Sequence, residues 1–212
     1  MESSDPSIVT VSVDGVHLEG ELNVPNGATG IVLFAHGSGS SRHSPRNNFV
    51  ADQVRARGTG TLLFDLLTEA EDRTYETRFD IPLLTERLVG ATQWVNDREP
   101  IATLNVGYFG SSTGSAAALR AAARPGTDVG AVVSRGGRVD LAYEALARVS
   151  APTLLIVGGN DRQVLQWNRD AFTRLPGEKS LEVIEGASHL FEEPGALEVV
   201  ADLAASWFAD NL

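Results

Sequence analysis

Hydrophobic and polar residues alternate in the first part of this chain. The alternation runs over residues 8–13 and again over residues 16–24, which is typical of strands buried on one face. Asp14 and Gly15 separate the two runs and suit the type I′ turn of a two-residue hairpin. We therefore expect an antiparallel hairpin at the edge of a sheet.

Further along the chain the hydrophobic runs become continuous. Residues 30–35 are apolar almost throughout, as a strand covered on both faces must be. Similar strands are predicted at residues 59–65, 104–109, 129–134, 153–159 and 181–184. Helices are predicted between and after them, at residues 47–58, 81–98, 115–123, 139–149, 164–175 and 195–208. Residues 68–80 are polar without apolar periodicity, so a loop is expected there.

The order of these elements predicts an α/β fold. An edge hairpin followed by repeated β-α units implies a mostly parallel sheet with helices on both faces. We expect the 212 residues to form one domain, residues 1–212. Only residues 135–152 separate two of the predicted strands, which leaves no room for a large cap domain. Ligands of such sheets bind at the carboxyl ends of the strands.

Composition narrows the classes of function. The net charge of −11 argues against nucleic acid or an anionic membrane as a partner. The chain has no cysteine, which excludes disulfides and thiolate ligands, and we expect neither a metal nor a cofactor. Residues 1–6 lack the apolar core of a signal peptide, and no run approaches the roughly 18 apolar residues of a membrane span. A cytoplasmic location is therefore expected.

One motif lies between a predicted strand and an alanine-rich predicted helix. Residues 110–114 read Gly-Ser-Ser-Thr-Gly, and strand, G-x-S-x-G, helix is the arrangement of a nucleophile elbow. Its serine sits on a sharp, strained turn, where a side chain two residues to either side would collide with a neighbour. In this register Ser112 is the nucleophile and Ser111 is not. The alternative is a glycine-serine turn that only joins strand to helix.

A second glycine-rich stretch, His-Gly-Ser-Gly at residues 36–39, follows the buried strand at 30–35. It lacks the Lys-Ser/Thr ending of a phosphate-binding loop. In a serine hydrolase, a loop at this place points a backbone N–H at the developing oxyanion. The expected donors are the N–H groups of Ser38 and Thr113. The alternative is a flexible loop without a catalytic role.

A serine hydroxyl needs a base to take its proton. His189 follows the last predicted strand and is the expected base, whereas His36 is expected to make structural hydrogen bonds. A base of this kind needs a carboxylate to orient it, and Asp161 follows the preceding predicted strand. Two alternatives are an N-cap role for Asp161 and the use of Asp140 as the acid.

Several arginines follow the predicted strands and so lie at the same rim. Guanidinium groups bind carboxylate or phosphate in a bidentate manner, which would suit an anionic substrate. The alternative, which we favour from composition, is that they pair with nearby acids such as Asp65. The candidates for contact with the substrate are Arg42, His43 and Arg135.

With these motifs the chain resembles the α/β-hydrolases, and within them the dienelactone-hydrolase-related group. The resemblance covers residues 8–212. It rests on residues 36–39, 110–114, 159–161 and 186–189, which stand where the family has its oxyanion loop, elbow, acid and base. Dienelactone hydrolases carry a cysteine nucleophile where this chain has Ser112, so the resemblance implies the fold rather than a dienelactone substrate. Similar domains also occur joined to phosphoribosyltransferase domains.

The expected function is that of a serine hydrolase. It would cleave small carboxylic esters, lactones or thioesters through an acyl-enzyme intermediate, and the missing cap predicts an open or shallow site. The expected partner is therefore a small ester-type molecule, and the sequence leaves the oligomeric state undefined. The alternative is a catalytically inactive hydrolase-fold module that serves in binding or assembly.

Overall fold

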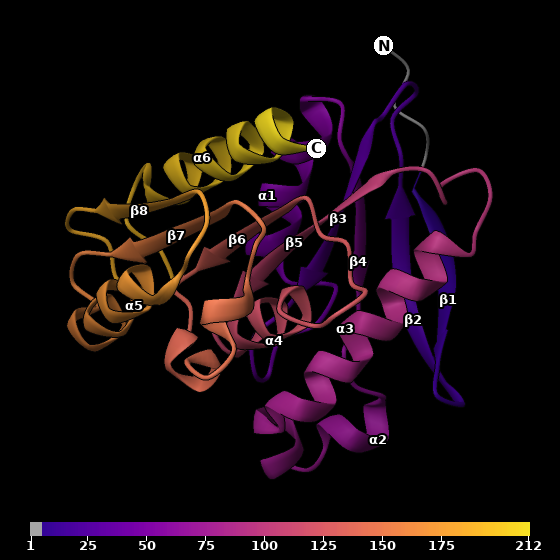
Figure 1. The fold of residues 1–212 in the computed structure, drawn as a ribbon, viewed down its shortest axis with the longest axis horizontal. Helices are drawn as coiled ribbons and strands as arrows, with labels where there is room; N and C mark the ends of the chain where they lie inside the picture. The colour runs from indigo at the N-terminus through magenta and orange to yellow at the C-terminus, as the bar shows by residue number, and fades with distance from the viewer. Residues whose placement is uncertain (1–5) are drawn as a thin grey trace.

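The computed structural model describes residues 6–212 and contains an eight-stranded sheet, shown in Figure 1. The strand order is β1-β2-β4-β3-β5-β6-β7-β8. β1 (Ser7–Val13) and β2 (Val16–Asn23) pair antiparallel, and β2 also pairs antiparallel with β4. The remaining neighbours are parallel. Their bounds are β3 Gly30–Ala35, β4 Gly60–Phe64, β5 Asn105–Ser111, β6 Ala131–Arg135, β7 Thr153–Gly158 and β8 Lys179–Ile184.

The predicted hairpin is confirmed, and its turn explains its register. Asp14 has φ 47° and Gly15 has φ 80°, and a type I′ turn needs positive φ at both central residues. Val13 consequently pairs with Val16, and the alternate residues Val9 and Val11 are buried on one face of the hairpin. β1 is one of the two edge strands of the sheet, and β8 is the other.

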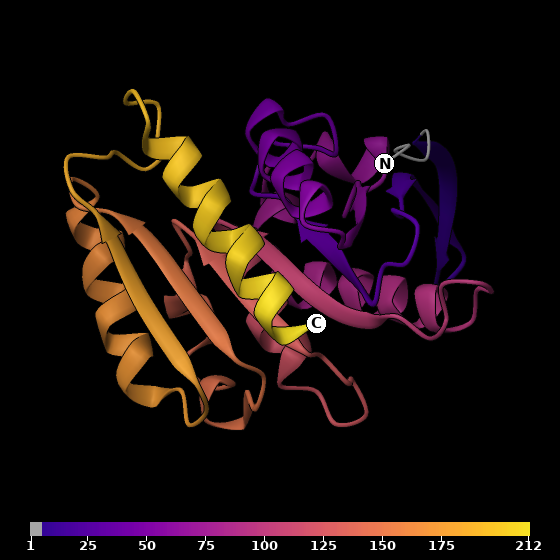
Figure 2. The same cartoon turned by 90° about the horizontal axis from the view of Figure 1, so that it is seen from above.

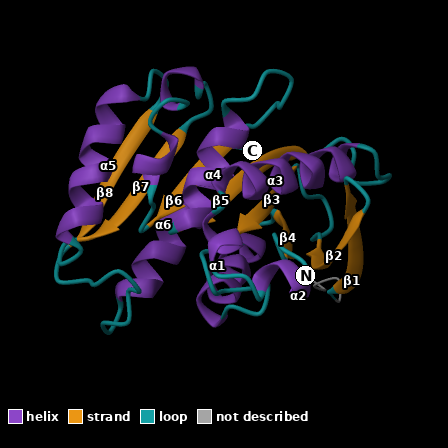
Figure 3. Cartoon of the chain, turned by 90° about the horizontal axis from the view of Figure 1, so that it is seen from below, coloured by secondary structure: helices purple, strands orange, loops and turns teal. Residues whose placement is uncertain are grey.

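Helices cover both faces of the sheet, as predicted. α1 (Pro45–Ala56) and α6 (Ala196–Asn211) lie side by side over one face (Figure 2). The other face is covered by α3 (Ile81–Asn96), α4 (Thr113–Ala122) and α5 (Arg162–Arg174) (Figure 3). The sheet therefore lies between two apolar layers, and every residue of β3, β4 and β7 is buried.

The apolar stripe predicted for the helix at residues 81–98 is confirmed. Leu84, Leu88, Ala91 and Val95 are all buried in the core beneath α3. The helix begins after Asp80, whose carboxylate accepts a hydrogen bond from the backbone N–H of Leu83 at 3.0 Å.

The loop prediction for residues 68–80 is wrong in part. The segment contains the short helix α2 (Glu69–Asp72) and the 3₁₀ turn η1 (Glu76–Phe79). A capping box forms α2, because Thr68 accepts from the backbone N–H of Glu71 while the Glu71 carboxylate accepts from the backbone N–H of Thr68. These local hydrogen bonds order the segment without an apolar stripe.

The short helix predicted at residues 139–149 is also wrong. The segment forms two 3₁₀ turns, η2 (Val139–Ala142) and η3 (Leu146–Arg148). A 3₁₀ helix has three residues per turn, so residues spaced by three lie on one side. The buried residues that follow this spacing are Val139, Ala142 and Ala145.

Three helices begin two residues earlier than predicted, and one of them is α5, which starts at Arg162 rather than at residue 164. α1 starts at Pro45 because Ser44 caps it, accepting from the backbone N–H of Asn47 at 3.3 Å. α4 starts at Thr113, directly after Ser112.

The expectation about a signal peptide rested on residues 1–6, of which residues 1–5 lie outside the described part of the chain. Within residues 6–212, no helix combines the length and the apolar character needed to cross a bilayer.

The buried stripe of α3 generates a test of this packing. Leu88→Ala is expected to lower the free energy of unfolding by about 2–5 kcal/mol, because it leaves a cavity in a fully packed core. Leu83→Ala, at a half-buried position of the same helix, should cost clearly less. Urea denaturation of both variants measures the difference, and equal losses would contradict the described orientation of α3.

Candidate active site

Ser112 is the single residue between a strand and a helix. β5 ends at Ser111 and α4 begins at Thr113, so the chain reverses its course at Ser112. Ser112 has φ 50° and ψ −117°, a conformation that residues with a Cβ rarely adopt. The strand–turn–helix context predicted for the motif is thus present, with the strain centred on Ser112.

Backbone hydrogen bonds hold this strained residue from both sides. The N–H of Ser112 donates to the carbonyl of Arg135 at the end of β6, at 3.1 Å. The carbonyl of Ser112 accepts from the N–H of Ser115 at 3.1 Å and from the N–H of Arg138 at 3.0 Å. The neighbouring strand and the loop after it therefore fix the turn.

The two glycines of the motif are needed because other backbone comes very close. A Cβ at Gly114 would lie 2.0 Å from the carbonyl oxygen of Ala35, and one at Gly110 would lie 2.5 Å from the Cα of Ser115. Real Cβ atoms do not approach backbone so closely. The glycines thus allow β3 and α4 to pack against the turn.

His189 and Asp161 come together from the loops after β8 and β7. His189 Nδ1 lies 2.6 Å from Asp161 Oδ2. Asp161 is the N-cap residue of α5, but its side chain makes no capping hydrogen bond. Its carboxylate is turned to the imidazole instead. With Nδ1 bonded in this way, Nε2 is the nitrogen left to accept a proton.

The rival acid, Asp140, is held elsewhere. Its two carboxylate oxygens accept from Nε and Nη2 of Arg138, both at 2.9 Å. This hydrogen-bonded pair raises the pKa of the Arg138 guanidinium. Asp140 is thus the partner of an arginine, whereas Asp161 is the partner of a histidine.

Gly136 connects the positions of Ser112 and His189. It directly follows Arg135, whose carbonyl binds the N–H of Ser112. A Cβ at Gly136 would lie 3.4 Å from Cε1 of His189, so the imidazole stands against the same end of β6. Among the described residues, no hydrogen bond joins Ser112 to His189. In enzymes without substrate such bonds are often long, and they close in the complex.

The glycine-rich loop lies against Ser112. A Cβ at Gly37 would be 3.1 Å from the Cβ of Ser112. The N–H of Ser38, one of the two expected oxyanion donors, donates to Oγ1 of Thr113 at 2.9 Å. Thr113, the other, is the first residue of α4, where a backbone N–H has no acceptor within the helix. The hydroxyl of Thr113 was missed by the sequence analysis, although a hydroxyl residue directly after the motif serine was a readable signal.

His36 supports this loop from beneath. Its Nε2 accepts the backbone N–H of Leu66 at 3.0 Å, so its proton is on Nδ1, which faces the carbonyl of Gly37 at 3.0 Å. Burial lowers the pKa of His36, which keeps the ring neutral. His36 therefore has the structural contacts expected for it.

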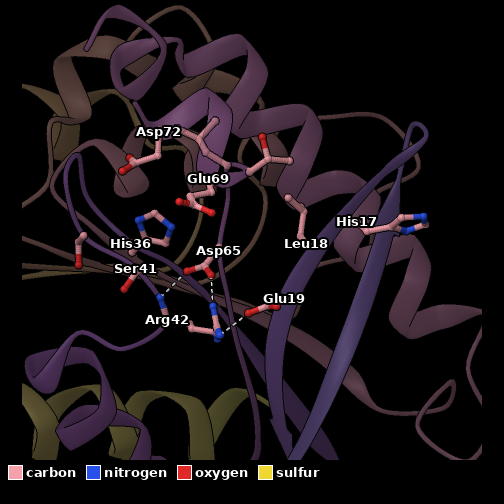
Figure 4. Close-up of a pocket in the computed structure, with 12 residues that line it drawn as sticks. His17, Leu18, Glu19, His36, Ser41, Arg42, Asp65, Glu69 and Asp72 are labelled. Carbon is pink, nitrogen blue, oxygen red and sulfur yellow. Dashed lines mark hydrogen bonds and ion pairs between the residues drawn. The ribbon is translucent and has the colours of Figure 1, made fainter. Parts of the chain in front are cut away.

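A cavity of about 430 Å³ lies beside the loop (Figure 4). His36, Ser40 and Ser41 form one part of its wall, and acidic residues of β2 and of the segment after β4 form much of the rest. Figure 4 shows Arg42 between Asp65 and Glu19, with which it forms ion pairs.

The three candidates for substrate contact differ in their surroundings. Arg42 is neutralised by two carboxylates, as in the ion-pair alternative, and its backbone N–H also donates to Asp65 at 2.8 Å. His43 is exposed and is not among the residues that line the cavity. Arg135 is buried, and no carboxylate among the described residues pairs with it.

Comparison with known proteins places this geometry in a family. No family model matches the chain. It is 54% identical, over 99% of its length, to proteins of two Mycobacterium tuberculosis strains that are provisionally named phosphoribosyl transferases. The chain spans about half, 48%, of these curated relatives.

Solved structures give matches over the full length. Dienelactone hydrolase from Anabaena variabilis is 56% identical, with 100% of both chains covered and a TM-score of 0.97. Est1E from Butyrivibrio proteoclasticus is 13% identical over 96% of this chain and 98% of its own, with a TM-score of 0.81, which shows the fold alone. The chain therefore belongs to the α/β-hydrolase superfamily, in the group related to dienelactone hydrolase.

Proposed function

We propose that this protein is a serine hydrolase that cleaves small carboxylic esters, lactones or thioesters through an acyl-enzyme intermediate. One observation carries the proposal: the strained Ser112 and an imidazole bonded to Asp161 lie at the same end of the sheet. A serine at such an elbow and an oriented histidine are the two parts that acyl transfer requires. The hydrolase family of the chain supports the same class of reaction.

The reaction would proceed in two steps. In the first, His189 Nε2 takes the proton of Ser112 Oγ as that oxygen attacks the acyl carbon, and then gives the proton to the leaving group as its bond to the acyl carbon breaks. In the second, His189 activates a water that hydrolyses the acyl-serine and regenerates the hydroxyl. Asp161 stabilises the imidazolium in both steps.

The oxyanion site that we propose uses Thr113 twice. Its backbone N–H, at the start of α4, is one donor. Its hydroxyl already accepts the N–H of Ser38, so the hydroxyl proton is free to be the second donor. Because Ser38 polarises that hydroxyl, the bond to the oxyanion is strengthened. Ser38 then acts through Thr113 rather than by direct contact.

The segment between β6 and β7 bears on substrate size. It is made of two short 3₁₀ turns and carries no cap domain. A site without a cap suits small or solvent-accessible esters better than long acyl chains that need a covered tunnel.

The name of the mycobacterial relatives does not favour a different reaction for this chain. It applies to proteins of which the matched segment is 48%. The matched segment has a hydrolase fold, and we propose hydrolysis as its activity. An inactive binding module remains the alternative, and an activated-ester assay separates the two.

Ser112 is expected to be the residue that is acylated. A fluorophosphonate probe should label the wild type, with the adduct on Ser112 in tandem mass spectrometry, because only this serine is held at the elbow. Ser112→Ala should abolish labelling, whereas Ser111→Ala, in the buried end of β5, should keep it. An adduct on Ser111 would refute the register.

Asp161→Asn is expected to fold normally and to lose activity by up to about 10⁴-fold, because the imidazole is then held in the wrong tautomer. Asp140→Asn is the matched control, since Asp140 pairs with Arg138, and it should keep most of the turnover. Steady-state kinetics on an activated ester compares the two. A crippled Asp140→Asn beside a nearly silent Asp161→Asn would reverse the assignment.

Thr113→Val is expected to lower kcat by about 10²-fold with a smaller change in KM, because it removes one oxyanion donor. Thr113→Ser keeps the hydroxyl and should restore most of the rate. If Thr113→Val is as fast as the wild type or faster, the proposed role of the hydroxyl is wrong. The hydroxyl would then occupy the N–H of Ser38, which would otherwise be free to bind the oxyanion itself.

A further inference from the structure

Arg135 is a buried cation without an anionic partner. It lies at the end of β6 and is 7% exposed. Its Nε and Nη1 are buried, with no hydrogen-bond partner among the described residues. Other arginines with well-buried side chains each bond a carboxylate, as Arg42, Arg55 and Arg87 show. Burial of an unpaired charge costs free energy, so we expect the guanidinium of Arg135 to bind an anion.

A second guanidinium, that of Arg46, lies close enough to Arg135 for its charge to act on it. Val133 packs in the apolar layer beneath α1 and α6, and Arg135, two residues further along β6, lies on the same face. Arg46, in the first turn of α1, also has a buried Nε without a partner. Burial and the positive charge of Arg46 together lower the pKa of Arg135 to about 10, which leaves it charged at neutral pH.

The carboxylates nearby leave this charge unbalanced. Arg46 Nη1 bonds Glu192 Oε1 at 3.3 Å, but Glu192 is largely exposed. The next residue, Glu193, has a buried Oε2 without a hydrogen-bond partner, and among the described residues it forms no ion pair with Arg135. Interactions with Ser188 lower the pKa of Glu193. Among the described residues, the exposed carboxylate of Glu192 is thus the only one that bonds either Arg46 or Arg135.

The two arginines border the residues of the proposed reaction. The carbonyl of Arg135 binds the N–H of Ser112, and the next residue, Gly136, stands against His189. Glu192, which bonds Arg46, comes three residues after His189. The backbone of Arg135 thus adjoins the proposed nucleophile, and Arg46 is bonded to the loop that follows the proposed base. An anion held by both guanidinium groups would therefore lie at the same end of the sheet as the proposed reaction.

We propose that Arg135 and Arg46 form a binding site for an anion of the carboxylate or phosphate type. Guanidinium groups bind both through paired, planar hydrogen bonds, and Nε and Nη1 of Arg135 have no hydrogen-bond partner among the described residues. The anion has two possible sources: a free anion from solution or an anionic substituent of the ester. The second source rests on the proposed hydrolase function, and the first does not.

The first arm of the test detects a free anion in the Ser112→Ala background, where no turnover occurs. Phosphate or acetate, at ionic strength held constant with chloride, should raise the melting temperature saturably, by roughly 5 °C at about 100 times Kd. Arg135→Met should abolish this shift and, without added anion, melt no lower than its parent, because it removes an unpaired charge. Arg169→Met, which removes an exposed arginine of α5, should keep the shift.

The second arm detects an anionic substituent in the protein with Ser112 intact. The ratio of kcat/KM for an ester bearing a carboxylate to that for its neutral isostere should exceed one at low salt and fall about tenfold or more in Arg135→Met. A shift in melting temperature with an unchanged ratio assigns a free anion, and a changed ratio assigns the substrate. If neither readout responds to Arg135→Met, the proposal is wrong. Because the first arm needs no catalysis, its result stands apart from the hydrolase proposal.

Discussion

The positive φ of Ser112 is the constraint to which the surrounding structure is fitted. A residue with a Cβ keeps φ 50° only when its neighbours prevent relaxation. Here the end of β6 holds its N–H, and the first turn of α4 and the loop after β6 hold its carbonyl. The packing of β3 against α4 then requires glycine at position 114. The turn thus connects β6, α4 and β3, and its strain is stored at the residue that we propose as the nucleophile.

The charged residues at this rim are of two kinds, those that bond an oppositely charged partner and those that do not. Asp161 and His189 bond each other, and Asp140 and Arg138 bond each other, so neither carboxylate is shared between the two pairs. Arg42 is likewise neutralised beside the cavity. Arg135 alone among these groups is buried and unmatched within the described residues. The rim therefore contains charged side chains that are paired with each other, and one buried guanidinium, that of Arg135, whose positive charge is not balanced by a bonded carboxylate.

The sequence was enough to predict most of the fold and the positions of the chemical groups. Parallel strands end at one edge, so Ser112, Asp161 and His189 could be expected together from their places after strands alone. The bond between Ser38 and Thr113 could not be predicted, because it depends on how a flexible glycine loop settles against the helix. Pairing with nearby acids was expected and holds for Arg42, but the lack of a partner at Arg135 could not be predicted, since it depends on which sheet face the side chain occupies. By contrast, the Thr-x-x-Glu spacing of Thr68 and Glu71 is readable in the sequence and could have indicated the capping box that begins α2.

The strand order gives the two halves of the site different local stability. Ser112 follows β5, which is paired on both sides in the interior of the sheet, whereas His189 follows β8, an edge strand (Figure 1). β8 is only half-buried along its length and is paired on one side alone. Opening of an edge element needs less free energy than opening of a central one. Ser112, the proposed nucleophile, therefore belongs to the central part of the sheet, whereas His189, the proposed base, belongs to its border. Local unfolding of the border would displace His189 before it disturbed the turn at Ser112.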